Sequence, residues 1–210
     1  MFNIDINPKT VIRDMCDFIC SEWDNLCKEF NIQVPIYINT GKQNLALMWD
    51  RCYKNSTKKR GASEFLRDYC NYPRDSSMYT VYCGTTAEGD VVQHVTIPCE
   101  ILYLLIIEFM DRIDVLKEYF RVSLKHEMGH CKANIELCVN SYDVYCKEYD
   151  QTREMLEKWI QEHPEPYSEE EYEYFYYSTP QEKRANDAVG LTVDELLTAS
   201  KLLSLDEEEE

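Results

Sequence analysis

Two histidines and a glutamate lie close together in the stretch His126-Glu127-Met128-Gly129-His130. On a helix, side chains four residues apart share one face, so both imidazoles would point the same way. Two neutral imidazoles at this spacing can bind one metal ion, and zinc accepts such nitrogen ligands. Glu127 would lie about 100° further round the helix, within reach of a water molecule at that ion. The stretch uses two of the 4 histidines in the chain.

A motif this short also occurs on ordinary solvated helices, so a metal centre needs a third protein ligand. Glu136 lies six residues after His130 on the helix expected to carry the motif, which we call the motif helix. Ala133, between them, favours a continuous helix, which would turn the Glu136 carboxylate away from the histidines. We therefore reject Glu136 as a ligand.

Glu182 is the better candidate for the third ligand. On a helix that begins near Pro180, Glu182 and Asn186 share a face, so Glu182 could bind the metal while Asn186 hydrogen-bonds to the back nitrogen of one histidine. The small Ala185 would let this helix approach the motif helix. The same residues fit an alternative without metal, because Thr179, Pro180 and Glu182 match a capping box with proline at N1. The local pattern alone favours the cap.

The elements that must position these residues are mostly helices. Apolar spacing predicts the motif helix from Asp114 to about Val139, after a largely buried helix from Cys99 to Met110. A hairpin is expected before them, with strands Met78–Cys83 and Val91–Ile97, the second ended by Pro98. We expect an α+β fold, a mostly helical domain with a small, largely antiparallel sheet packed on the motif helix.

Further elements follow from the same periodicity: a first helix with apolar positions from Val11 to Phe30, a strand at Val34–Asn39, helices at 42–53, 63–69 and 144–160, and a last helix at Thr179–Leu203 weakened by Gly190. Residues 1–205 would form a single domain, with 140–177 as a helical, acidic, tyrosine-rich insertion and 206–210 as an acidic tail. Within the insertion, residues 168–177 either form a lid over the cleft that would hold the metal, or pack on the domain through their aromatic face. Packing is favoured, because aromatic residues at helical spacing usually belong to a core.

Charge and cysteine content narrow the classes of function. The 210 residues carry a formal net charge of −17 and no basic stripe, so no nucleic-acid partner is expected. The longest apolar run, 101–107, is far too short to span a bilayer, so no membrane partner is expected either. The N-terminal residues lack the form of a secretory signal. We therefore expect a cytoplasmic, reducing compartment and free thiols for the 10 cysteines.

The two motifs together resemble those of gluzincin metallopeptidases, most closely the compact minigluzincins of phages, mobile elements and bacteria. Those proteins often show H-E-x-G-H followed by E-x-x-A-N or E-x-x-A-D, and this chain has His126-Glu127-Met128-Gly129-His130 and then Glu182-Lys183-Arg184-Ala185-Asn186. The order of hairpin, buried helix, motif helix and glutamate helix is also similar, over roughly residues 78–200. Two features depart from the family: 51 residues separate His130 from Glu182, and Arg184 replaces a residue that is often acidic.

The resemblance implies that the mostly helical α+β domain is zincin-like and that the protein is a zinc-dependent metallopeptidase that hydrolyses peptide bonds. His126, His130 and Glu182 would be the zinc ligands, with Zn²⁺ as the cofactor. Glu127 would be the general base, and Asn186 would support one histidine through a hydrogen bond. The partner would be a protein or peptide substrate, added as a strand at the edge of the sheet.

Other roles remain open from the sequence. Gly129 would let an edge strand or the substrate run close to the motif helix. His94, Tyr176 and Tyr177 are candidates for a further donor to the oxyanion. The alternative function is a catalytically silent zincin-fold binding protein, for example one encoded by a phage, whose acidic surface engages a partner protein.

Overall fold

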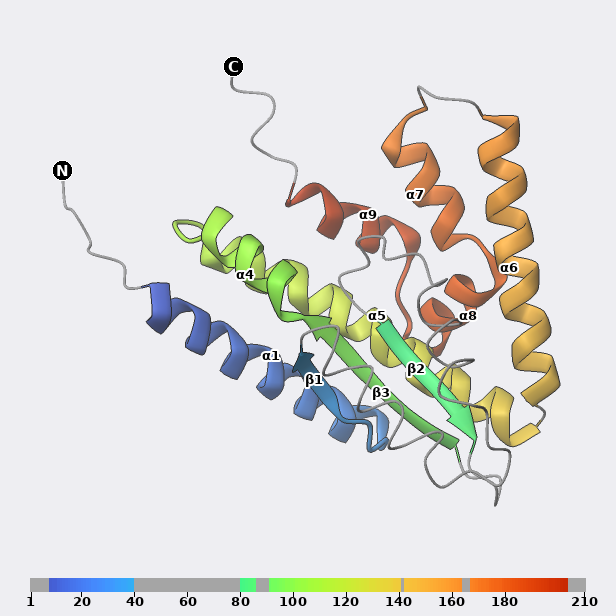
Figure 1. The fold of residues 1–210 in the computed structure, drawn as a ribbon, viewed down its shortest axis with the longest axis horizontal. Coiled ribbons are helices and arrows are strands. Elements are labelled where there is room, and N and C mark those ends of the chain that lie inside the picture. Colours follow the sequence, from blue (N-terminus) through green and yellow to red (C-terminus); the bar gives the residue numbers. More distant parts are fainter. Residues whose placement is uncertain (1–7, 40–79, 86–90, 141, 164–166, 204–210) are drawn as a thin grey trace, which may run out of the picture.

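A computed structural model describes residues 8–39, 80–85, 91–140, 142–163 and 167–203. They form α1 (Pro8–Phe30), β1 (Ile36–Asn39), β2 (Thr80–Thr85), β3 (Val91–Pro98), α4 (Cys99–Glu108), α5 (Ile113–Asn140), α6 (Tyr142–Glu162), α7 (Glu169–Tyr177), α8 (Pro180–Val189) and α9 (Val193–Lys201) (Figure 1). The expected α+β class, mostly helical with a small sheet, is confirmed. The helices expected at 42–53 and 63–69 and the acidic tail at 206–210 lie outside the described residues.

The sheet has the strand order β1-β3-β2 and is mixed. The expected hairpin strands β2 and β3 pair antiparallel, with Thr80 opposite Thr96. In contrast, β1 pairs parallel to β3, with Ile36 opposite Val95, so the expectation of a largely antiparallel sheet is wrong for this strand. A strand joined to its neighbours by no tight turn can pair in either direction, and its local sequence does not fix which.

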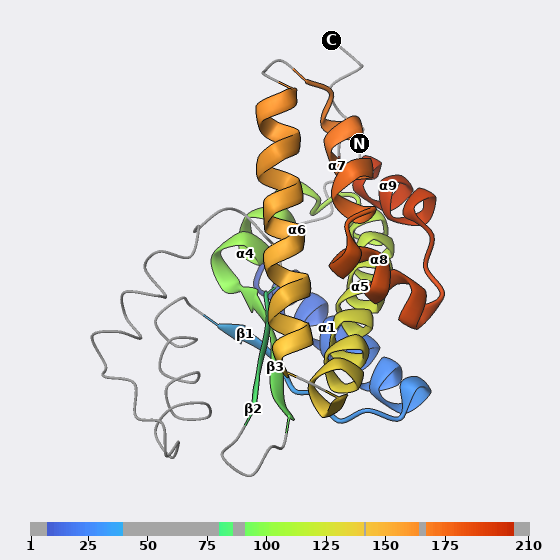
Figure 2. The ribbon, with the colours of Figure 1, turned by 90° about the vertical axis from the view of Figure 1, so that its right-hand side faces the viewer.

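The motif helix α5 runs through the middle of the fold, between the sheet on one side and α8 and α9 on the other (Figure 2). Leu116, Phe120 and Leu124 are fully buried, as their four-residue spacing predicts. Helix α1 packs beside α5 through its own buried stripe, which includes Trp23. The indole of Trp23 donates a hydrogen bond to the Val34 carbonyl oxygen at 2.6 Å and so fastens α1 to the chain entering β1.

The last helix of the expected pattern is two helices. Gly190 adopts φ = +68° and ends α8, because a left-handed residue cannot continue a right-handed helix and glycine takes that conformation at little cost. Helix α9 then begins with a complete capping box between Thr192 and Glu195. The break lets α8 and α9 each pack against α5.

Helices α6 (142–162) and α7 (169–177) agree with the helical character expected for this part of the chain. Trp159 of α6 is buried, and its ring stacks on His163 with centroids 4.4 Å apart. The rings of Tyr167, Tyr172 and Phe175 surround the same tryptophan at centroid distances of 5.1–5.6 Å, so the aromatic face of α7 packs against α6. Within the described residues, none of the helices combines the length and the apolar character that crossing a membrane requires.

Candidate metal centre

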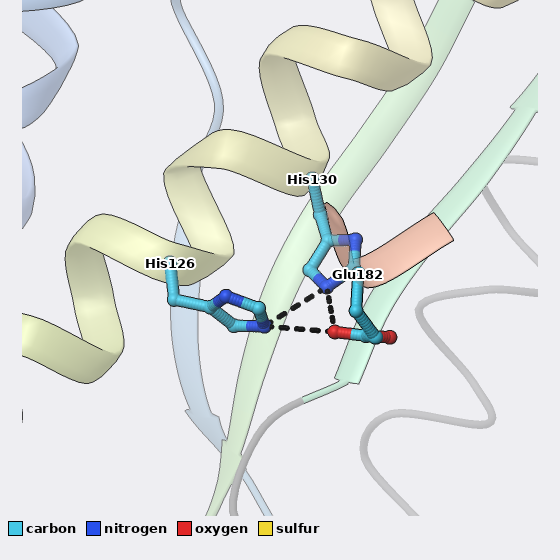
Figure 3. A group of neighbouring side chains, drawn as sticks. All are labelled: His126, His130 and Glu182. Carbon is cyan, nitrogen blue, oxygen red and sulfur yellow. Dashed lines mark hydrogen bonds and ion pairs between the residues drawn. The ribbon is translucent and has the colours of Figure 1, made fainter. Parts of the chain in front are cut away.

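The structure brings together the three residues expected as ligands. His126 and His130 project from α5, and Glu182 reaches them from α8 (Figure 3). The Nε2 atoms of the two histidines are 3.1 Å apart, and Glu182 Oε2 lies 3.0 Å from His126 Nε2 and 3.1 Å from His130 Nε2. The three atoms therefore form an almost equilateral triangle, and this buried group could hold a metal ion.

A close contact between two helices makes this convergence possible. A Cβ atom added to Gly129 would lie 2.8 Å from the carbonyl carbon of Ala185, closer still to its oxygen, and 3.2 Å from Val189 Cγ2. Only glycine therefore lets the α8 backbone lie this close to α5 at the turn between the two histidines. The close neighbour of Gly129 is α8, and not the edge strand or substrate that the resemblance implied.

The direction of the Glu182 side chain argues against the helix cap. Glu182 is 4% exposed, and its carboxylate turns to the histidines. The Thr179 hydroxyl makes no capping bond to α8 and instead donates to the Tyr176 carbonyl oxygen at 2.7 Å. The capping-box alternative is wrong at this position, although Pro180 does occupy the first turn.

Asn186, one turn after Glu182, supports His126 from behind. Its Oδ1 lies 2.7 Å from His126 Nδ1, and both side chains are buried. An Nδ1–H that donates to the amide oxygen leaves Nε2 deprotonated and directed towards Glu182, which is the state a metal ligand needs. This contact is the one expected from the shared face of Glu182 and Asn186.

Charge pairing shapes the protonation of the group. Burial disfavours the charged form of His130, but the adjacent Glu182 carboxylate outweighs it and raises the pKa of His130 to about 9. The pKa of Glu182 is correspondingly lowered, against the effect of burial, by the two histidines. In the metal-free protein at neutral pH this pair is an imidazolium and a carboxylate. A divalent cation would replace that proton.

Glu127 lies beside the triangle and differs from Glu182 in having no hydrogen-bond partner among the described residues. Burial raises the pKa of Glu127, the two histidines lower it in part, and Glu182 raises it further. A half-buried carboxylate of raised pKa, free to accept a proton, is what general-base chemistry needs.

Two tyrosines of α7 cover the site. The Tyr177 ring packs edge-on against His126 with centroids 5.6 Å apart. The Tyr176 hydroxyl hydrogen-bonds to Glu182, and burial together with the charges of Glu182 and Glu127 raises the pKa of Tyr176 well above its usual value. Both tyrosines named as oxyanion candidates thus lie at the centre, where a protonated hydroxyl can donate.

His94 and Glu136 lie elsewhere. Gln93 donates from its Nε2 to the Cys131 carbonyl oxygen of α5 at 2.8 Å, so the next residue, His94, points to the opposite face of the sheet, against the Tyr37 ring. The suggestion that His94 acts at the site is therefore wrong. Glu136 is exposed and outside the triangle, in agreement with its rejection.

Gln93 is a supporting residue that the sequence analysis missed. Its hydrogen bond joins the central strand β3 to α5 one residue after His130, and its side chain is 6% exposed. The available signal was its alternation with Val95 and Ile97, which put a polar side chain on an apolar strand face.

No known protein family, curated protein or solved structure matches this chain. The functional assignment therefore depends on the geometry of its own residues.

Proposed function

We propose that this chain is a zinc-dependent peptidase with a zincin-like fold of the gluzincin type. The observation that carries the proposal is the convergence of His126, His130 and Glu182, with the carboxylate of Glu127 beside them and without a hydrogen-bond partner in the described part of the chain. A structural site would need no such base, and a helix cap would need no histidines.

The donor set fits zinc. Tetrahedral zinc with bonds of about 2.0–2.1 Å places its ligand atoms about 3.3–3.4 Å apart, and the three atoms here are 3.0–3.1 Å apart. Two imidazole nitrogens and one carboxylate oxygen form a set used by zinc peptidases, in which three protein ligands leave a fourth position open. Small adjustments of the three side chains would bring their ligand atoms to the separation that zinc requires.

When bound, zinc would lower the pKa of water to about 7 and polarise the substrate carbonyl. Glu127 would accept the proton of the attacking water and pass it to the leaving amine as the peptide bond breaks. The raised pKa of Glu127 suits a group that must hold this proton between the two steps. Tyr176 would remain protonated and donate to the developing oxyanion, with Tyr177 beside it.

The substrate would be a protein or peptide, and the net charge of −17 favours basic ones. The three ligands are between 4% and 8% exposed, and α7 lies against two of them. A peptide could reach them only after α7 moves, so we propose that α7 is a lid. The same burial favours a second candidate function, a catalytically silent metal-stabilised protein that binds a partner through its acidic surface.

Glu127→Gln tests the proposal, with Glu136→Gln as the control because Glu136 is an exposed glutamate on the same helix. We expect zinc content, measured by mass spectrometry, to be unchanged in both variants. Cleavage of a peptide library should fall about 10²- to 10⁴-fold in Glu127→Gln alone, the usual contribution of a general base.

Equal cleavage by Glu127→Gln and the wild-type protein would show that the activity does not come from this site. If the zinc-loaded protein cleaves no peptide, even with residues 168–177 replaced by a short polar linker, the silent binding protein is the better assignment.

A further inference from the structure

His126 and His130 differ in how their back nitrogens are held. His126 Nδ1 lies 2.7 Å from Asn186 Oδ1, whereas both hydrogen bonds of His130 within the described residues are made by Nε2. Metal-binding histidines almost always donate their second N–H to a carboxylate, a carbonyl or a water, because this fixes the ring and its tautomer. His130 therefore needs a partner for Nδ1.

A small cavity lies next to His130. Its volume is ≈ 10 Å³, and its walls combine apolar side chains with five polar or charged ones, those of His130, Asn134, Glu148, Gln181 and Arg184. A space of about 10–15 Å³ holds one water molecule when two to four polar groups can bind it. The cavity thus has the size and the polarity for a single bridging water.

Two charged side chains line this cavity, Glu148 of α6 and Arg184 of α8. The Glu148 carboxylate is bound by Arg184, with Nε 2.9 Å from Oε1 and 3.0 Å from Oε2 and with Nη2 2.6 Å from Oε1. The Glu148 side chain is only 12% exposed. A carboxylate has about four acceptor sites, so the three contacts with Arg184 leave one for a water.

We infer that Glu148 is a positioning residue for His130, acting through one water held between its carboxylate and His130 Nδ1–H. The water accepts from the imidazole and donates to the carboxylate, so each histidine of the centre gains an oriented partner. Helix α6, which carries Glu148, then fixes the direction of one ligand. This inference depends on the proposed metal centre and is independent of peptide hydrolysis.

A purely structural role for Glu148 is the competing explanation, because its ion pair with Arg184 also joins α6 to α8. Glu148→Ala and Arg184→Ala break that same ion pair, but only Glu148→Ala removes the acceptor for the water. The two variants are therefore matched controls for each other. Glu148→Gln keeps an acceptor oxygen without the charge and serves as the conservative rescue.

The experiment is histidine-optimised ¹H–¹⁵N NMR of the full-length, zinc-loaded protein, together with zinc affinity from chelator competition. We expect slowly exchanging Nδ1 protons on both His126 and His130 in the wild-type protein and in Arg184→Ala. Glu148→Ala should lose the His130 signal, keep the His126 signal and bind zinc about 10- to 100-fold more weakly. Glu148→Gln should retain the His130 signal.

A His130 signal that survives in Glu148→Ala, or that disappears equally in Arg184→Ala, would overturn the inference. A second measurement needs no variant: a cross-relaxation peak between His130 Nδ1–H and a long-lived water in the wild-type protein, whose absence also overturns it. If His126 shows its signal and His130 does not, only this inference fails. If the wild-type protein binds no zinc, the metal centre itself fails.

Discussion

Gly129→Ala adds one methyl group between α5, which carries His126 and His130, and α8, which carries Glu182. The new Cβ would lie 2.8 Å from the Ala185 carbonyl carbon, and ordinary contact begins at 3.4 Å, so α8 must move by at least 3.4 − 2.8 = 0.6 Å. The obstacle is backbone within a helix, so no side-chain rotation can relieve it. The displacement also carries Glu182 away from the histidines, because Glu182 is part of α8.

This displacement exceeds what a metal centre tolerates, since coordination distances vary by only about 0.2 Å. We expect zinc affinity to fall at least about 100-fold, because disturbing an outer partner alone costs about 10- to 100-fold. Overpacking should also lower the free energy of unfolding of the metal-free protein by about 1–3 kcal/mol, partly offset by the better helix propensity of alanine.

Gly190→Ala is the matched control. It is the same glycine-to-alanine change at the end of α8, the helix that carries Glu182, and a Cβ at Gly190 would meet nothing within 4 Å. Its positive φ makes alanine destabilising by about 1 kcal/mol, but Glu182 stays in place. In urea unfolding, both variants should therefore be less stable than the wild-type protein. In chelator competition, only Gly129→Ala should bind zinc more weakly.

Zinc binding by Gly129→Ala within about threefold of the wild-type protein would contradict this expectation. Such a result would mean that α8 can move without moving Glu182 or that Glu182 is not a ligand.

Three other perturbations follow from the same geometry. Asn186→Ala should weaken zinc binding about 10- to 100-fold, because His126 loses the partner of its Nδ1. Asp187→Ala, at the exposed neighbouring residue, should leave zinc affinity unchanged. Calorimetric titration of both variants with zinc would show the difference. Trp159→Ala should remove about 3–5 kcal/mol of packing energy, loosen α7 and speed the removal of zinc by EDTA. Ile160→Ala, at a residue that is 46% exposed, should not change the rate of zinc removal. Equal rates in the two variants would contradict the proposal that α7 is a lid. The pKa of His130, raised to about 9, implies that zinc displaces a proton, so apparent affinity should rise about tenfold per pH unit from about pH 7 to 9 and then level off. Over the same range the metal-free protein should lose stability in urea unfolding, since a raised histidine pKa stabilises the fold fully below about pH 6.5 and not above 9; a flat response would contradict the pairing with Glu182.

Elements governed by neighbouring residues were predictable from the sequence. The spacing of Leu116, Phe120 and Leu124 defines the buried face of α5, and the same periodicity places His126 and His130 on one face one turn apart. The relative position of residues four apart is set by the backbone of their own helix, so it does not depend on the rest of the fold.

Features that depend on distant segments were not predictable. The parallel pairing of β1 with β3 depends on a partner more than fifty residues away in sequence, and so does the role of Gly129, whose close neighbour Ala185 is on another helix. The cavity shared by His130 and Glu148 likewise exists only once α6, α5 and α8 are packed together.

The chain contains the pattern Thr-x-x-Glu at the start of both α8 and α9, and the two glutamates behave differently. Glu195 is exposed and folds back to cap Thr192. Glu182 is buried, and its carboxylate lies 3.0–3.1 Å from two imidazoles and makes no capping bond at Thr179. Burial strengthens the attraction between this carboxylate and charged or polarised histidines beyond what a single backbone amide offers. The sequence by itself determined that two histidines would share a helix face and that a glutamate would begin a later helix. Only the tertiary structure, by bringing that glutamate into a buried place opposite the histidines, decided that it completes a candidate metal centre.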